Sequence, residues 1–332
     1  MRLVFFLLLA ALPSWTQQLR IYAVDVEGGK ATLYISPSGQ SMLIDAGYAG
    51  NHNRDANRIA AAAKVAGIGR IDFLVITHYH GDHAGGVPQL AATMKIGRFY
   101  DHGDNFDAAN AKTEAVFRPY AAVRARYPHT TLKAGDFVPI QGLSVQVVSA
   151  SGKAIARPLP GAGQANPLCA DYRPLPNDPG ENARSLAFLI TFGDFRVADF
   201  GDLYWNQEHD LACPVNKVGV VDLYMTTHHG TKTSGSPQMV DALHPRVAIM
   251  NNGASKGGSV KAWKTIHGSP GLLDLWQLHF SNEGGRQHNV GEAFIANPGV
   301  PCTGDWIEVS ADRDGSFTVR NSRNGFEKTY RK

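Results

Sequence analysis

The stretch that decides the fold runs from residue 71 to residue 86 and reads IDFLVITHYHGDHAGG. Its first six residues form an apolar run that predicts a buried strand. If extended backbone continues beyond this strand, the side chains of His78 and His80 point to the same side, because side chains alternate along a strand. A glycine then permits a sharp turn, after which Asp82 and His83 present an oxygen and a nitrogen.

This stretch predicts a metal site. Two imidazoles on one side of a chain suit a divalent ion of the zinc type. Four potential ligands stand within six residues, namely His78, His80, Asp82 and His83, and this number exceeds the needs of one open catalytic site. The spacing therefore predicts two adjacent metal ions. A histidine-rich loop, or stacked polar groups at a strand end, is the alternative that this spacing disfavours.

The His-x-His-x-Asp-His pattern resembles the signature of the metallo-β-lactamase fold superfamily, and the resemblance extends from about Leu19 to Asn297. It is most similar to the ComEC-type branch, which includes the phosphorylcholine esterase that acts on teichoic acids. The resemblance implies an α/β (α+β) fold, a four-layer αββα sandwich, and a metal-dependent hydrolase. Two zinc ions are expected, with manganese or iron as alternatives and single-metal occupancy left open.

The resemblance also implies roles for residues outside the first motif. Asp202 matches the family's aspartate that bridges both metals. The pair His228-His229 matches its last ligand motif. Because successive side chains on an extended chain diverge, we expect His229 to bind metal and His228 to act as a polariser or proton donor to the leaving group. Asp45 matches an aspartate that braces the metal loop by hydrogen bonding, and Asp82 can also orient the attacking metal-bound hydroxide.

One departure from the family pattern concerns the first metal. Many enzymes of this fold add a third histidine ahead of the bridging aspartate, but neither His102 nor His129 stands at that place. Residues 181–186 stand there instead and are similar to the Asn-x-x-Ser-Leu of the ComEC-type branch. We therefore expect His78, His80, Asp202 and water on this metal, with Asn182 nearby.

Three residues are predicted to contact substrate: Asn182, Asn252 and Lys256. The last two belong to residues 251–258, which read NNGASKGG and resemble the ComEC-type loop that follows the histidine motif. Backbone amides in this loop, together with Asn252 and Lys256, would hold an anionic oxygen. A flexible surface loop is the alternative.

Periodicity outlines the rest of the chain. Residues 157–181 are rich in proline and glycine and too long for an ordinary connection, so we expect a loop that caps the site and divides two α/β halves. Helices are expected at 53–65, 87–94 and 108–126. Strands are expected at 20–26, 31–35, 41–47, 71–76, 96–100, 143–148, 185–191, 195–199 and 218–227, and at 246–250 as the last core strand.

The N-terminus predicts export. Residues 1–16 combine a basic start, a short apolar core and small residues suited to cleavage before Gln17, so they read as a signal peptide. The mature protein, 17–332, is expected to be one secreted or periplasmic hydrolase domain that is not in the membrane. The formal charge of +3 falls by one to +2 with the loss of Arg2, which gives no electrostatic case for a nucleic-acid surface.

The chain has three cysteines. In an oxidising compartment, one disulfide and one free thiol are the simplest account. We favour a Cys169–Cys213 pair, because both residues lie in proline-rich loops near the expected site, and this leaves Cys302 free. Zinc ligation by cysteine is disfavoured, since the sequence has no close Cys-x-x-Cys pair.

The substrate is expected to be a small-molecule or polymer ester, with a phosphodiester as the first choice by analogy with the ComEC-type branch. A lactone, thioester or β-lactam hydrolase on the same site is the main alternative. A non-catalytic exported metal-binding module is a further one. The sequence does not specify the oligomeric state.

Overall fold

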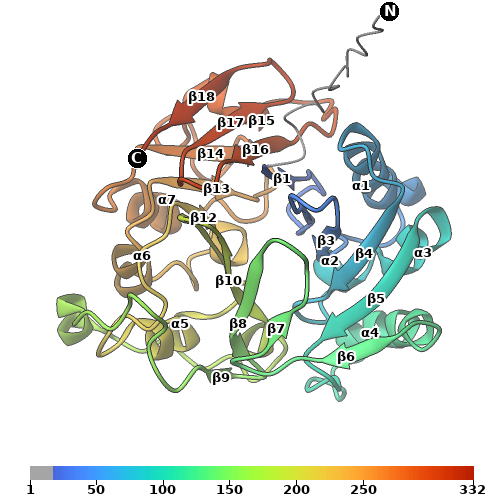
Figure 1. The fold of residues 1–332 in the computed structure, drawn as a ribbon, viewed down its shortest axis with the longest axis horizontal. Coiled ribbons are helices and arrows are strands. Elements are labelled where there is room, and N and C mark those ends of the chain that lie inside the picture. The colour runs from blue at the N-terminus through green and yellow to red at the C-terminus, as the bar shows by residue number, and fades with distance from the viewer. Residues whose placement is uncertain (1–17) are drawn as a thin grey trace, which may run out of the picture.

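The structure is a computed structural model that describes residues 18–332. The predicted signal peptide at 1–16 lies outside the described residues. Two large sheets pack face to face, and helices cover their outer sides (Figure 1). Among residues 18–332, the structure has no helix with the length and apolar character that crossing a membrane requires.

The first sheet has nine strands in the order β18–β17–β16–β1–β2–β3–β4–β5–β6. Their bounds are β1 Leu19–Ala23, β2 Thr32–Ile35, β3 Ser41–Ile44, β4 Arg70–Val75, β5 Lys95–Asp101, β6 His129–Thr131, β16 Ile307–Ala311, β17 Phe317–Asn321 and β18 Glu327–Tyr330.

The second sheet has the order β15–β14–β13–β12–β11–β10–β8–β7, with β9 paired to β8. Its bounds are β7 Phe137–Val138, β8 Ser144–Ala150, β9 Lys153–Ala154, β10 Ala187–Phe192, β11 Phe195–Asp199, β12 Leu223–Met225, β13 Val247–Met250, β14 Asp274–His279 and β15 Ile295–Asn297.

The α-helices are α1 Arg54–Val65, α2 Gly81–Ala84, α3 Val87–Thr93, α4 Ala111–Arg124, α5 Trp205–Ala212, α6 Pro237–Leu243 and α7 Val260–His267. Short 3₁₀ helices are η2 Asn51–Asn53, η3 Pro167–Asp171, η4 Asn182–Arg184, η5 Thr227–Gly230 and η6 Glu292–Phe294.

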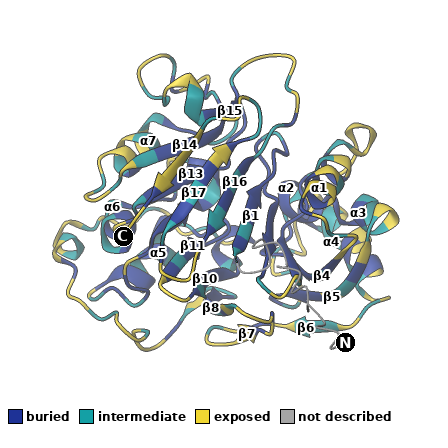
Figure 2. Ribbon diagram, turned by 45° about the horizontal axis from the view of Figure 1, so that its top comes forward, coloured by how far each residue is buried: buried dark blue, intermediate teal, exposed yellow. Residues whose placement is uncertain are grey.

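Three clusters of buried apolar side chains hold the layers together. The central cluster lies between the sheets and includes Val75 of β4 and Val197 of β11. The neighbouring residue Leu74 belongs to a second cluster, in which the first sheet packs on α1, α3 and α4. The third cluster joins the second sheet to α5, α6 and α7. The apolar run of β4 is thus buried on both faces, and the strands are mostly buried while the helices expose their outer sides (Figure 2). These layers confirm the predicted αββα fold class.

The strand directions position the functional loops. In the first sheet β3, β4 and β5 are parallel neighbours, and in the second sheet β11, β12 and β13 are parallel neighbours. The carboxyl ends of parallel neighbouring strands lie along one edge of a sheet, where ligand sites form. This edge carries Asp45 and residues 76–83 in the first sheet, and residues 200–202, 226–231 and 251–258 in the second.

Two predictions about the order of the elements differ from the structure. The chain passes from the first sheet to the second between Thr131 and Phe137, whereas the sequence places the divide at 157–181. The prediction that 246–250 is the last core strand is wrong, because β14–β18 follow it and β16 pairs with β1. Figure 1 shows β16, in red, beside β1, in blue.

The predicted disulfide is present. Cys169 and Cys213 are bonded across a sequence separation of 44, and Cys302 is the free cysteine among the described residues. The bond ties the 157–181 loop to the end of α5.

Removal of this disulfide should destabilise the fold. The closure entropy of a loop of this length corresponds to about 4 kcal/mol. We expect Cys169→Ser/Cys213→Ser to lower the urea midpoint of unfolding, and a thiol reductant to lower that of the unmodified protein similarly. The reductant should not affect the double variant further, and an unchanged midpoint in that variant would contradict the expectation.

Candidate metal centre

The first group of potential ligands follows β4 directly. His78 and His80 come together as predicted, with Nε2 of His78 3.1 Å from Nδ1 of His80. The hydroxyl of Thr77 donates to Asp45, so it accepts from Nδ1 of His78 at 3.1 Å. His78 therefore carries its proton on Nδ1 and presents the lone pair of Nε2 toward His80. Two ring nitrogens held this close can bind one ion jointly.

Asp45 braces this loop, as the resemblance implies. Its carboxylate accepts from the Thr77 amide and the Thr77 hydroxyl, each at 2.8 Å. It also accepts from Nδ1 of His83 at 2.8 Å, which leaves Nε2 of His83 free to face the centre. Such a partner fixes the tautomer and the ring orientation of a metal-binding histidine. Asp45 has a positive φ of 64°, which turns the chain at the end of β3 toward the loop.

The second group gathers four buried side chains whose ligand atoms all lie within 4.8 Å of one another, namely Asp82, His83, Asp202 and His229. Oδ2 of Asp82 is 3.2 Å from Nε2 of His83 and 3.1 Å from Nε2 of His229. These residues come from both sheets, so the fold brings together distant parts of the chain. They form a candidate buried metal site of aspartate and histidine.

Asp202 lies between the two groups. Its Oδ2 is 3.2 Å from Nε2 of His83, 3.4 Å from Nε2 of His229 and 3.9 Å from Nε2 of His78. Its other oxygen, Oδ1, is buried and has no hydrogen-bond partner within residues 18–332. A buried carboxylate oxygen without a partner is costly unless a cation or another donor joins it. The donor set therefore fits metal ions of the zinc type.

The electrostatics of the site favour ionised carboxylates. Burial by itself would raise the pKa of Asp82, but the charges and hydrogen bonds of His83, His229 and Lys256 outweigh it and hold that pKa well below its usual range. The pKa of Asp202 is also held well below its usual range, because the charges of His83, His229 and His228 outweigh the effect of burial. Both carboxylates thus carry the negative charge that a cation requires.

The paired histidines lie in a turn and not on extended backbone. His228 and His229 belong to η5 and have φ values of 53° and 56°. The premise that their side chains diverge along a strand is therefore wrong. Nε2 of His228 lies 3.5 Å from Oδ2 of Asp202, so both rings reach the same carboxylate.

The hydrogen bonds of His228 fix its tautomer. The hydroxyl of Ser234 donates to the Leu203 carbonyl and so accepts from Nδ1 of His228 at 3.0 Å. Burial lowers the pKa of His228 to about 4, so the ring is neutral near pH 7. Nε2 is then an acceptor that faces Asp202. This tautomer suits a ligand or a proton acceptor better than the proton donor expected from the sequence.

The predicted substrate-binding residues are placed differently from one another. Lys256 reaches the centre, because its ammonium pairs with Asp82 and lies 3.1 Å from the Tyr48 hydroxyl. Asn182 is buried, and its Oδ1 has no partner in the described part of the chain. Asn252 donates both of its amide hydrogens to backbone carbonyls, those of His279 and Gly253. It therefore has no hydrogen left to donate to a substrate.

Two bracing residues were missed in the sequence. Glu181 is fully buried and accepts from the Tyr79 amide at 3.1 Å, between the two ligand histidines. It also accepts from Nε2 of His102 at 2.9 Å, so His102 supports the loop from behind. Asn251 lies beside His229, with its carbonyl oxygen 3.3 Å from Nδ1. His129 is half-buried and pairs with Asp101.

Asp45 offers a test of the bracing contacts. We expect Asp45→Asn to weaken metal binding by about 10- to 100-fold, as loss of an outer hydrogen-bond partner usually does, because His83 is no longer held by a charged acceptor. Titration against a competing chelator measures the affinity. Asp210→Asn, which changes an exposed carboxylate on α5, is the matched control. Equal affinities in the two variants would contradict the bracing role.

Comparison with known proteins agrees with this geometry. Residues 24–165 match the sequence model of the metallo-beta-lactamase superfamily. A UPF0173 metal-dependent hydrolase of Cupriavidus metallidurans is 32% identical over 69 residues, which are 21% of this chain and 22% of that protein. The ribonuclease Z of Alkaliphilus oremlandii is 36% identical over 64 residues, or 19% and 18% of the two chains. The matches thus span about a fifth of each relative. The assignment to the ComEC-type branch stays a prediction.

Similar solved structures include the metallo-beta-lactamase fold protein YhfI from Bacillus subtilis, with a TM-score of 0.45 and 11% identity over 79% of this chain and 96% of that one. A metal-dependent hydrolase from Parabacteroides distasonis has a TM-score of 0.42 and 16% identity over 78% and 92% of the two chains.

Proposed function

We propose that this chain, placed in the metallo-β-lactamase superfamily, is a metal-dependent hydrolase with two adjacent zinc-type ions and that its substrate is a phosphodiester. The observation that carries the proposal is the meeting of two ligand groups at one carboxylate oxygen, Oδ2 of Asp202. One group is His78 with His80, and the other is Asp82 with His83 and His229. A shared carboxylate offsets the mutual repulsion of two cations.

The side chains around the proposed metal ions have different roles in hydrolysis. When bound, such ions lower the pKa of a coordinated water and stabilise negative charge on oxygen. Asp82 can hold and orient the water through its free lone pairs. Lys256 and Tyr48 provide a cation and a hydroxyl at the mouth of the site, 3.1 Å apart, where an anionic substrate oxygen can dock. His228 can accept a proton at Nε2.

The space beside the site also suits a polar substrate. A cavity of about 590 Å³ is lined by residues that adjoin the catalytic segments in sequence, among them Thr231, Lys232, Ser255 and Gly257. Hydroxyls and an ammonium in this wall match an ester with charged or hydroxylated groups. One of the relatives matched is by name a ribonuclease, and RNA is a phosphodiester polymer. This supports a phosphodiester as the bond that is cleaved.

A panel assay tests the proposal. We expect turnover of bis(p-nitrophenyl) phosphate by the purified chain, loss of turnover after treatment with a chelator, and recovery on addition of zinc or manganese. Chelator-sensitive turnover of nitrocefin, a lactone or a thioester in place of the phosphodiester would instead establish the alternative hydrolase. Metal binding without turnover of any compound would support the non-catalytic module.

Lys256 should contribute to substrate binding. Loss of one charge-assisted hydrogen bond costs about 1.5–3 kcal/mol, so we expect Lys256→Met to lower kcat/KM by roughly 10- to 100-fold, mainly through KM. Lys64→Met, an exposed lysine on α1, is the matched control and should leave both constants unchanged. A fall in kcat at constant KM would contradict a binding role.

We further propose that the protein is exported to the periplasm or the medium. The signal-like residues 1–16 motivate this proposal, and the Cys169–Cys213 disulfide supports it, because such bonds persist in oxidising compartments. Cell fractionation with N-terminal sequencing tests it. A mature chain that begins at Gln17 is the expected result, and an uncleaved cytosolic chain would overturn it.

A further inference from the structure

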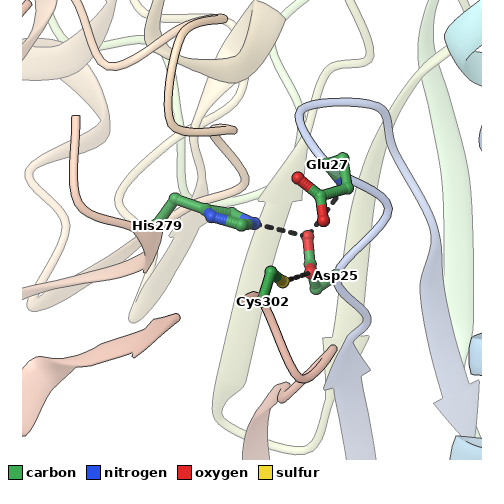
Figure 3. Close-up of side chains that lie close together, drawn as sticks. All are labelled: Asp25, Glu27, His279 and Cys302. Carbon is green, nitrogen blue, oxygen red and sulfur yellow. Dashed lines mark hydrogen bonds and ion pairs between the residues drawn. The ribbon is translucent and has the colours of Figure 1, made fainter. Parts of the chain in front are cut away.

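A second group of metal-binding side chains lies outside the centre described above. It consists of Asp25 and Glu27 from the β1–β2 loop, His279 at the end of β14 and Cys302 in the loop after β15 (Figure 3). Their ligand atoms all lie within 4.8 Å of one another. Asp25 and His279 are buried, and the other two are half-buried.

Asp25 is the middle of this group. Its Oδ1 accepts from Nε2 of His279 at 2.7 Å, and its Oδ2 accepts from the thiol of Cys302 at 3.0 Å (Figure 3). The three segments that meet here are far apart in the sequence, since Asp25 and Cys302 are separated by 277 positions. A single loop with an accidental cluster of acidic residues would not bring a thiol and an imidazole to the same carboxylate.

We propose that Asp25, Glu27, His279 and Cys302 form a structural zinc site, separate from the catalytic centre. Carboxylate oxygen, imidazole nitrogen and thiolate sulfur are the three ligand types that zinc takes in proteins. In a tetrahedral zinc site with bonds of about 2.0–2.3 Å, ligand atoms are roughly 3.3–3.8 Å apart. The four donor atoms all lie within 4.8 Å of one another, and the contacts of Asp25 with His279 and Cys302 are 2.7 and 3.0 Å. Small movements of these side chains would reach the zinc spacing. Zinc takes the place of two protons, the thiol proton of Cys302, which leaves to solvent, and the proton that Nε2 of His279 donates to Asp25, which is replaced by one on Nδ1 of the same ring. A Zn–S bond and a Zn–N bond then form.

Arg58 of α1 completes the charge balance. Its Nη1 is 2.7 Å from Oδ2 of Asp25 and 3.4 Å from Oε1 of Glu27, and its Nη2 is 3.4 Å from the sulfur of Cys302. With zinc bound, two carboxylates and one thiolate carry three negative charges. The ion and the Arg58 guanidinium together carry three positive charges. In this arrangement Arg58 is an outer partner of the ligands, and the site is neutral.

A catalytic role for Cys302 does not fit the same geometry. Burial, and then the charge of Asp25, raise the pKa of the thiol to about 12, so without a metal it is protonated and a poor nucleophile. Four protein ligands also leave no open position on zinc, which is typical of a structural site.

The position of the group explains what such a site would stabilise. The β1–β2 loop that carries Asp25 and Glu27 continues to Lys30, whose amide donates to the carbonyl of Asp82 at 3.0 Å. Gly28, between them, lies so close to the loop of Lys256 that an added Cβ would be 3.0 Å from the amide nitrogen of Gly253. A zinc ion would therefore anchor a loop that packs between two segments of the catalytic centre.

Cobalt(II) provides a specific test, because thiolate ligation gives an intense charge-transfer absorption in the near ultraviolet. Only Cys302 can supply that thiolate, since Cys169 and Cys213 are bonded to each other. We expect titration of the purified full chain with cobalt(II) to produce the band. The band should remain in Asp202→Asn, which damages the catalytic centre, and disappear in Cys302→Ser. Zinc analysis should show one equivalent less in Cys302→Ser than in the unmodified protein.

Two further variants keep the test decisive. Arg58→Met should retain the band if Arg58 is an outer partner, and His279→Ala should lose it or weaken cobalt binding at least tenfold. Circular dichroism verifies that each variant is folded. Absence of the band at excess cobalt(II) in the folded, unmodified chain, or its persistence in Cys302→Ser, would overturn the proposal. Because the readout does not use hydrolysis, this failure would leave the proposed function untouched.

Discussion

Replacement of Asp202 by asparagine should lower kcat/KM for the best substrate of the panel by about 1000-fold, which corresponds to about 4 kcal/mol of lost transition-state stabilisation. Asparagine keeps the size of the side chain and removes its negative charge. That charge faces His78, His83 and His229 through Oδ2, so its loss weakens both ligand groups at once. We also expect the metal content of the purified variant to fall.

Steady-state kinetics and elemental analysis on the same preparations check this expectation. Asp210→Asn removes an exposed carboxylate from the same half of the chain and should change neither quantity. Retention of full metal content with full activity in Asp202→Asn would show that the carboxylate is not shared. Loss of activity at full metal content would assign Asp202 a role in the reaction beyond ligation.

Lys30→Met should destabilise the fold by about 3–5 kcal/mol, because it leaves a buried carboxylate without its cation. Nζ of Lys30 is 2.8 Å from Oδ1 of Asp199, and both side chains are almost inaccessible, at 1% and 0% exposure. The pair connects β11 in the second sheet to the β1–β2 loop of the first. Tyr34 donates to the other oxygen of Asp199 at 2.9 Å but brings no positive charge.

Urea unfolding of Lys30→Met, Asp199→Asn, the double variant and the control Lys64→Met separates the pair from general damage. Lys64→Met, at an exposed position, should shift stability by less than about 0.5 kcal/mol. Asp199→Asn in the Lys30→Met background should recover part of the loss, since the uncompensated charge is gone while the partner of Tyr34 remains. Additive losses in the double variant would contradict a direct interaction between Lys30 and Asp199.

Sequence patterns predicted the fold well where contacts are local. The apolar run of β4 and the alanine-rich helix α1 follow from periodicity alone, and the spacing of His78, His80, Asp82 and His83 determines how they meet. The strands expected at 185–191 and 195–199 are present as β10 and β11, which pair in antiparallel fashion. In each case the residues that decide the structure are neighbours in the chain.

Contacts between distant segments were not predictable in the same way. Glu181 braces the histidine loop from about a hundred positions away, and no local pattern distinguishes it from a loop carboxylate. The extended backbone assumed for His228 and His229 was wrong, because both adopt positive φ, which is rare for histidine and depends on the surrounding turn. His229 nevertheless lies in the candidate metal site, as expected. Helices α6 and α7 were not among the predicted helices, but the sequence contains a signal for the start of each. Ser236 and Ser259 act as their N-caps.

The proposed structural zinc site of Asp25, Glu27, His279 and Cys302 was also not predictable from local sequence patterns. The sequence has no Cys-x-x-Cys pair, and zinc ligation by cysteine was therefore not expected, but a cysteine can also bind zinc together with ligands that are distant in the sequence. Cys302, in the loop after β15, contacts Asp25, in the loop after β1, although these two strands belong to different sheets. A pattern search along one chain cannot detect such a meeting.

The pairing of β1 with β16 has a consequence for biosynthesis. Leu19 of β1 lies opposite Ala311 of β16. Strand β1 is synthesised early, and it can pair with β16 only after nearly the whole chain has been made. Such high contact order slows folding. Until the ribosome has finished β16–β18, one edge of β1 has free amide and carbonyl groups that can pair with other nascent strands. A chain stalled before residue 307 should therefore require a chaperone to remain unaggregated.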